Sequence, residues 1–214
     1  MNKELPWNTW GNFGINLALG NTLDKAITSE EYMYLPDYVY KAFKRAKKTK
    51  NSKSISLIKN ENILLNFKEK EIKTQWYNPF FIFSIILLLT LVITYRDQKR
   101  NKRSKWVDFS LFFVTGLVGL LICFLWFFTD HFTAPNNFHF LWAFAPNICI
   151  SFVLLKKKLP SWVSKYIKGY LLMLSLTIVV SVIGIQQFSF AVLPVIATLF
   201  VRNFYLYKLL TSKK

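Results

Sequence analysis

The sequence predicts an all-α integral membrane protein, a bundle of five transmembrane helices preceded by a small extracytoplasmic segment of mixed α and β structure. Two observations lead to this prediction. The last two-thirds of the chain contain five strongly apolar runs, each close to the roughly 20 residues that a helix needs to cross the hydrocarbon core. The connections between them alternate between strongly basic and free of Lys and Arg. The runs are Trp76–Tyr95, Phe109–Thr129, Phe138–Leu155, Tyr166–Ile185 and Phe188–Tyr207.

Residues 1–75 are expected to form the extracytoplasmic segment, and residues 76–214 the transmembrane domain. The first part has mixed charge, several Gly and Pro residues and no long apolar run. Within it, Ser29–Lys50 is predicted as a helix, since it begins with a common capping residue and ends on basic side chains. Ser54–Ile58 and Ile63–Phe67 are predicted as the two strands of a hairpin that leads into the membrane.

The start of the chain does not resemble a secretory signal. Met1–Gly20 has neither the basic start nor the unbroken apolar stretch of a signal peptide. An outside amino terminus of this length normally requires such a signal or an upstream span, so we expect the chain to be the downstream part of a longer protein. Two alternatives are an internal methionine as the start, and an inverted topology with residues 1–75 in the cytoplasm.

The third run is the least regular of the five, because Pro146 and Asn147 lie in its middle. Aromatic residues at its start and three lysines after Leu155 nevertheless favour a membrane span. In the second run, Thr115 and Gly119 form a pair of small residues with Gly116 beside it, which predicts close approach of a neighbouring helix.

Other polar residues in or near the spans are expected to serve packing rather than to line a pore. Gln186 and Gln187 are predicted to bond backbone groups at the corner between the last two runs. Arg202 lies near the inner end of the last run, where its side chain is expected to snorkel to the cytoplasmic headgroups.

The charge of the connections predicts the orientation. The connection after the first run carries six Lys or Arg residues against Asp97, the one after the third run carries five with no acid, and the tail adds four. The positive-inside rule places these segments and the C-terminus in the cytoplasm, and residues 1–75 outside. The chain is therefore expected to cross its membrane several times. The inverted alternative would put two heavily basic loops outside.

The net charge of +17 does not indicate nucleic-acid binding. Fifteen of the 28 basic residues fall in the predicted cytoplasmic loops and tail, where topology and anionic lipid account for them. Membrane lipids are therefore the expected partners. Cys123 and Cys149 both lie in predicted spans, so they indicate no disulfide framework.

Two stretches of sequence carry a family resemblance, one near the start of the chain and one between the second and third runs. The residues concerned are Trp10, Gly11, Gly14, Gly20, Asp24, Pro36 and Asp37 in the first stretch, and Thr129, Asp130, His131, Asn137, Trp142 and Pro146 in the second. The first resembles the end of the periplasmic domain of the Lnb-like family, named for the lipoprotein N-acylating transacylase of some Gram-positive bacteria. The second resembles the signature of the five-helix transmembrane domain that follows in Bacteroidota relatives.

The resemblance implies a catalytic part that this chain does not carry. Family members resemble papain-like enzymes in using a cysteine and a histidine in the periplasmic domain, upstream of the first motif. This chain has no cysteine before Cys123, and acyl transfer through a thioester needs an activated thiolate beside a base. The expected function is therefore that of a non-catalytic membrane module that anchors or completes an extracytoplasmic domain acting on lipids or lipoproteins. Its further partner would be an upstream or separately encoded periplasmic Cys/His domain.

Two other functions remain open at the level of sequence. The loop with Asp130 and His131 could form a lipid-modifying site at the membrane surface, with His131 as acid or base; the structural alternative is that these groups cap helix ends. The chain could also be a small transporter or channel, for which solute flux in proteoliposomes is the test. Two histidines and one acid are few ligands for a metal site, and neither a metal nor another cofactor is expected.

Overall fold

The computed structural model describes residues 9–24, 36–50, 53–65, 76–130 and 133–212. The described chain is mostly helical and contains one small two-stranded sheet. It divides into two compact units, one made of residues 1–24 with 73–214 and the other of residues 25–72.

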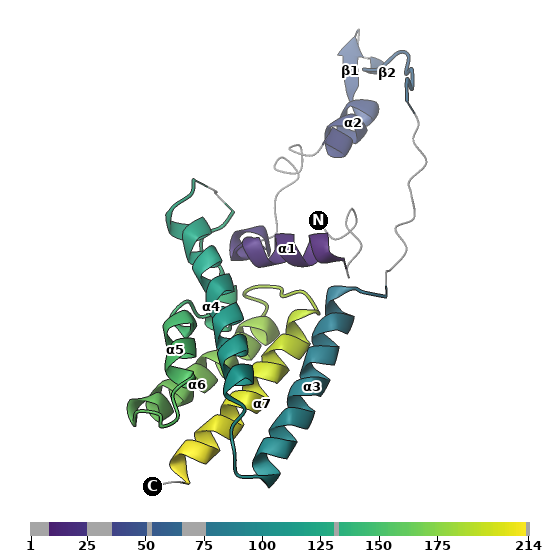
Figure 1. Ribbon diagram of the computed structural model, residues 1–214. Coiled ribbons are helices and arrows are strands. Elements are labelled where there is room, and N and C mark those ends of the chain that lie inside the picture. Colours follow the sequence, from purple (N-terminus) through teal and green to yellow (C-terminus); the bar gives the residue numbers. More distant parts are fainter. Residues whose placement is uncertain (1–8, 25–35, 51–52, 66–75, 131–132, 213–214) are drawn as a thin grey trace. The chain divides into compact units, whose positions relative to one another are not determined.

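Four long helices form the frame of the larger unit (Figure 1). They are α3 (Pro79–Lys99), α4 (Lys105–Phe127), α6 (Trp162–Ile183) and α7 (Val192–Thr211). Within the described chain, these are the helices long and apolar enough to cross a membrane. Helix α7 is the most buried of the four and packs against both α3 and α6. The helical count therefore supports a multi-pass membrane protein, while the predicted fifth full-length span is not confirmed.

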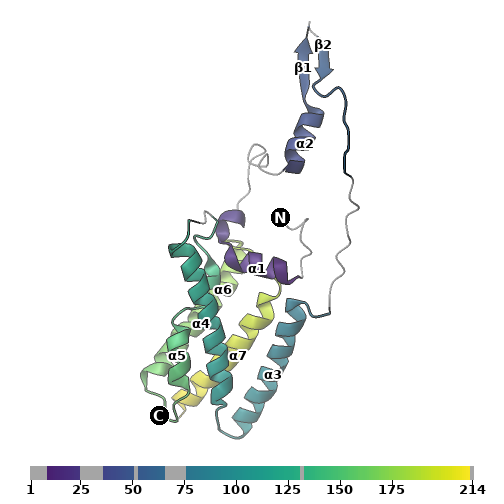
Figure 2. The same ribbon diagram turned by 45° about the horizontal axis from the view of Figure 1, so that its top comes forward.

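The third apolar run forms two short helices instead of one long one. The 3-10 helix η3 (Phe138–Leu141) is followed by a turn and then by α5 (Asn147–Leu154). Pro146 explains the break, because it lacks an N–H and disfavours helical geometry in the residue before it. In Figures 1 and 2, α5 lies beside α4 and α6.

Helix α4 approaches this broken segment closely through two glycines. A Cβ on Gly116 would overlap the backbone N of Ile148, and one on Gly119 would overlap the carbonyl O of Ala143. The predicted close approach at the small residues of α4 is therefore confirmed. Beside this contact, Asn147 donates to Thr115 Oγ1 across 3.2 Å, so the polar side chains here join packed helices.

Helix α1 (Trp10–Ala18) begins after the cap residue Thr9 and is followed by η1 (Asn21–Asp24). It crosses the ends of the long helices (Figure 1). Phe13 and Leu17 pack against the buried core of the larger unit. We refer to this end of the bundle as the α1 end, and to the end with the loop between α3 and α4 as the opposite end.

The smaller unit contains α2 (Pro36–Arg45) and the antiparallel pair β1 (Lys47–Lys50) and β2 (Lys53–Ser56). The predicted helix over 29–50 is therefore wrong at its C-terminal end, and its first residues lie outside the described chain. Further helix after Arg45 would stack lysines at i and i+3 or i+4, which repel. The predicted hairpin is also wrong: the partner of the 53–56 strand precedes it, and residues 63–65 form no strand.

Candidate functional site

A set of hydrogen bonds joins α1 to the loop between α4 and η3. The Gly20 N–H donates to Thr133 O across 2.8 Å, and the Asn21 N–H donates to Asn136 O across 3.3 Å. Asn137 Nδ2 donates to Leu17 O across 2.8 Å, so it satisfies a carbonyl at the C-terminal end of α1. These bonds fix the end of α1 against residues more than 100 positions later in the chain.

Glycine is required where this loop meets the segment after α1. A Cβ on Gly20 would overlap Pro135 O and would lie 3.1 Å from Ala134 O. The close approach of the two backbones therefore depends on the absence of a side chain at Gly20.

A second set of bonds joins α1 to the corner between α6 and α7. Asn16 Nδ2 donates to Gln187 O, and Asn16 Oδ1 accepts from the Ser189 N–H, both across 2.9 Å. Gln186 Nε2 donates to Leu19 O across 3.2 Å, and its Oε1 accepts from the Phe138 N–H across 2.7 Å. The predicted bonding of Gln186 to backbone groups is confirmed, and this side chain connects α1, η3 and the corner.

His139 lies at the centre of these contacts and is fully buried. Trp142 Nε1 donates to His139 Nδ1 across 2.9 Å, and His139 Nε2 lies 3.2 Å from Asn16 Oδ1. An indole N–H can only donate, so Nδ1 is the acceptor and Nε2 carries the proton. An imidazole whose Nδ1 accepts a hydrogen bond is neutral. We call the contacts of Asn16, Gly20, Asn137, His139 and Gln186 the α1 joint.

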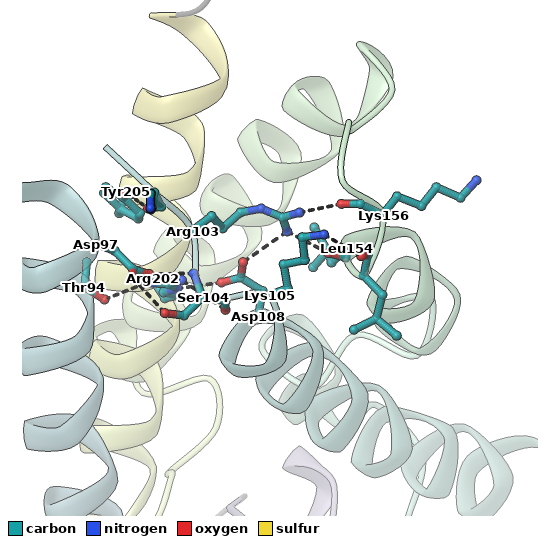
Figure 3. Close-up of polar contacts among 12 residues, drawn as sticks. Thr94, Asp97, Arg103, Ser104, Lys105, Asp108, Leu154, Lys156, Arg202 and Tyr205 are labelled. Atoms are coloured by element: carbon teal, nitrogen blue, oxygen red, sulfur yellow. Dashed lines mark hydrogen bonds and ion pairs between the residues drawn. The ribbon is translucent and has the colours of Figure 1, made fainter. Parts of the chain in front are cut away.

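The opposite end of the bundle contains a buried network of charges (Figure 3). Arg202 of α7 is fully buried and donates to Asp108 Oδ1 of α4 across 2.6 Å and to Asp97 Oδ2 of α3 across 2.8 Å. It also donates to Thr94 Oγ1 across 3.2 Å. The expectation that Arg202 snorkels to the headgroups is therefore wrong, because two carboxylates satisfy the guanidinium inside the bundle.

Arg103 extends this network to α5. It lies 3.2 Å from the second oxygen of Asp108, and it donates to the carbonyls of Leu154 and Lys156 across 2.7 and 2.9 Å. Lys105 Nζ reaches the carbonyl of Leu155 across 3.2 Å. Cations at the C-terminal end of a helix satisfy its free carbonyls and complement its dipole. We call Asp97, Arg103, Asp108 and Arg202 the charge network; its two positive and two negative side chains balance.

The family model of the Lnb transmembrane domain matches residues 70–214. The chain belongs to the Lnb-like family. Comparisons with curated proteins and with solved structures found no match. The matched range includes the charge network, η3 and the α6–α7 corner, whereas α1 lies before it. In this Lnb-like protein the α1 joint therefore connects the matched domain to the segment that precedes it.

Five of the thirteen motif residues of the Lnb-like chain lie at the α1 joint or at the start of α5 or of the matched domain. Gly20, Asn137 and Trp142 lie in or against the α1 joint. Trp10 donates from Nε1 to Tyr77 O across 2.8 Å, at the start of the matched domain. Pro146 immediately precedes α5. The structure thus brings part of the first motif into contact with part of the second.

The remaining motif residues are not gathered at the α1 joint. A Cβ added to Gly11 or Gly14 would have no neighbouring atom within 4 Å. Thr129 Oγ1 donates to Leu125 O at the end of α4. Asp24 ends η1, and Pro36 and Asp37 begin α2 in the smaller unit. Asp130 follows Thr129 and is exposed, and His131 lies outside the described residues.

Sequence reasoning missed Asn16 and Ser189, and it counted His139 only as one of the two histidines that are too few for a metal site. Asn16 lies in the otherwise apolar stretch Gly14–Gly20. Its partners are 123 to 173 residues away, so no local pattern indicates them. Among the described residues, no group of three His, Cys, Asp or Glu side chains could hold a metal ion.

Proposed function

We propose that this chain is the membrane module of an Lnb-like cell-envelope protein, and that it anchors or completes an extracytoplasmic domain acting on lipids or lipoproteins. The α1 joint carries this proposal. It connects the matched transmembrane domain to the preceding segment through Asn16, Gly20 and their partners. A module of this kind must hold a domain in a defined position above the bilayer, and several directional bonds to a rigid bundle achieve that.

The proposed module does not itself perform catalysis. The two cysteines, Cys123 and Cys149, lie in α4 and α5. A thiolate nucleophile would have to be charged in or beside hydrocarbon there, which burial disfavours. His139 is neutral and both of its ring nitrogens are occupied by Trp142 and Asn16. The reactive cysteine and histidine would come from an upstream or separately encoded periplasmic domain.

The proposal includes an orientation and a fifth span. The α1 end faces outward, and the basic loops and C-terminus face the cytoplasm of a bacterial inner membrane. Together η3 and α5 occupy the place of a broken fifth span, whose non-helical backbone is tolerated because protein surrounds it. Reporter fusions at Lys50, Ser104, Asn136 and Lys214 test the orientation, and a cytoplasmic reporter at Lys50 would overturn it.

The functional test is complementation in a strain that lacks this chain. The readout is the acylation state of cell-envelope lipoproteins, together with membrane lipid composition, both measured by mass spectrometry. Wild-type protein and the Cys123→Ser, Cys149→Ser double variant should restore both equally. The Asn16→Ala, Asn137→Ala double variant should fail to restore them although its level in the membrane is normal.

The results separate the proposal from a catalytic loop. Loss of activity in the variant without cysteines, at a normal membrane level, would contradict the non-catalytic role. Loss in His131→Ala, with full activity in the Asn16, Asn137 double variant, would favour a lipid-modifying site in the loop instead. If deletion of the chain changes neither lipoproteins nor lipids, the proposed role in their modification is wrong.

A further inference from the structure

The smaller unit has an exposed apolar surface. None of its described side chains is fully buried. Phe43 of α2 is 55% exposed, and Tyr38, Tyr40 and Ile55 are each exposed by more than two-fifths. A helix and one short hairpin are too small to form a stable core by themselves, so these apolar groups remain available to a second surface.

The same unit is strongly basic. The sequence over 36–65 contains eight Lys or Arg residues against Asp37 and Glu61, which gives a net charge of +6. Glu61 is itself paired with Lys44 across 3.1 Å and accepts a hydrogen bond from Tyr40. The positive charge is therefore little compensated within the unit.

The cations lie among the apolar groups. Lys41 Nζ lies 5.5 Å above the ring of Tyr38, and Lys44 Nζ lies 5.3 Å above the ring of Tyr40. In the hairpin, Lys48 pairs directly with Ile55, so these two positions share one face of the sheet. Lys53, two positions before Ile55, belongs to the same face.

This mixture fits a lipid headgroup region better than a protein surface. The centres of protein interfaces are depleted in lysine, whereas here lysines alternate with aromatic rings. Aromatic rings favour the membrane–water interface, and each Lys or Arg near an anionic surface contributes about 1 kcal/mol, or roughly fivefold in affinity. The charge selects anionic lipid over neutral lipid.

We infer that α2 and the β1–β2 hairpin bind the surface of a bilayer that contains anionic phospholipid. The lysines contact the phosphates, and Phe43 with its neighbouring apolar side chains enters the headgroup region. The inference requires neither a particular side of the membrane nor the proposed function, because it depends only on the surface of this unit.

The test uses the full chain in nanodiscs, which present both bilayer faces. A Cys123→Ser, Cys149→Ser background receives Phe43→Cys, labelled with an environment-sensitive fluorophore. The nanodiscs contain either phosphatidylcholine alone or phosphatidylcholine with phosphatidylglycerol, and brominated acyl chains report insertion by quenching. Quenching should be several-fold stronger with phosphatidylglycerol and should weaken at high salt, which screens the attraction.

Charge variants complete the test. Reversal of Lys47, Lys48 and Lys53 to Glu should reduce quenching to the level of neutral nanodiscs, while their replacement by Arg should preserve it. The matched control reverses three exposed lysines of the larger unit to Glu, namely Lys157, Lys158 and Lys165. Equal quenching in the two lipids, an equal loss in the control, or loss in the Arg variant would each overturn the inference.

Discussion

The two ends of the helical bundle are held by different chemistry. The charge network fixes α3, α4 and α7 through Arg202 and two carboxylates, all withdrawn from water. The α1 joint instead uses neutral amides, backbone groups and His139. A buried charge left without its partner costs far more than a broken neutral hydrogen bond. The loss of one partner is therefore expected to destabilise the charged end more than the neutral end.

Loss of Arg202 should produce the largest decrease in the free energy of unfolding. The Arg202→Ala variant leaves Asp97 and Asp108 buried without their shared cation, which should cost about 3–5 kcal/mol of unfolding free energy. The measurement is a denaturing-detergent titration of the purified chain. The matched control is Lys208→Ala, an exposed residue of the same helix, which should change stability by less than about 0.5 kcal/mol.

A charge-balanced version of the network sharpens this result. Arg202→Met combined with Asp97→Asn removes one positive and one negative charge and leaves Arg103 paired with Asp108, so it should be more stable than Arg202→Ala alone. If the two variants are equally unstable, the uncompensated carboxylates are not the cause.

Closure of the α1 joint should be sensitive to a single methyl group. In the Gly20→Ala variant the new Cβ overlaps Pro135 O, and the backbones must separate at a cost of about 1–3 kcal/mol. Hydrogen exchange at the Gly20 position and at Asn21 should then accelerate, while the amides of α3 and α7 remain protected. Gly14→Ala is the control, since its Cβ meets open space and Ala favours helix. Equal exchange in both variants would contradict a tight contact at Gly20.

The length and hydrophobicity of the apolar runs were sufficient to predict the long helices of the bundle. Four apolar runs correspond to α3, α4, α6 and α7. The close packing at Gly116 and Gly119 was also predictable, because small residues at helical spacing on one face let a neighbouring backbone approach, and this spacing is visible in the sequence. The break at Pro146 was visible, but its consequence, two short helices in place of one, depends on packing against α4.

The polar contacts could not be predicted in the same way. Arg202 is indistinguishable in sequence from a residue that snorkels, and only the fold places Asp97 and Asp108 beside it from about 100 positions earlier. The predicted hairpin between 54–58 and 63–67 was wrong for a similar reason. Residues 63–65 are more apolar than Lys47–Lys50, yet pairing was decided by the short connection to β2.

The bonds of Asn16 have a consequence for how the chain is made. Helix α1 is synthesised before any of the membrane helices, but its partners Gln187 and Ser189 come 171 and 173 residues later. The ribosome must therefore complete nearly the whole polypeptide before this corner exists. Seating of α1 is consequently a late step of biogenesis, and a seated α1 reports that the preceding helices and the corner have reached their places.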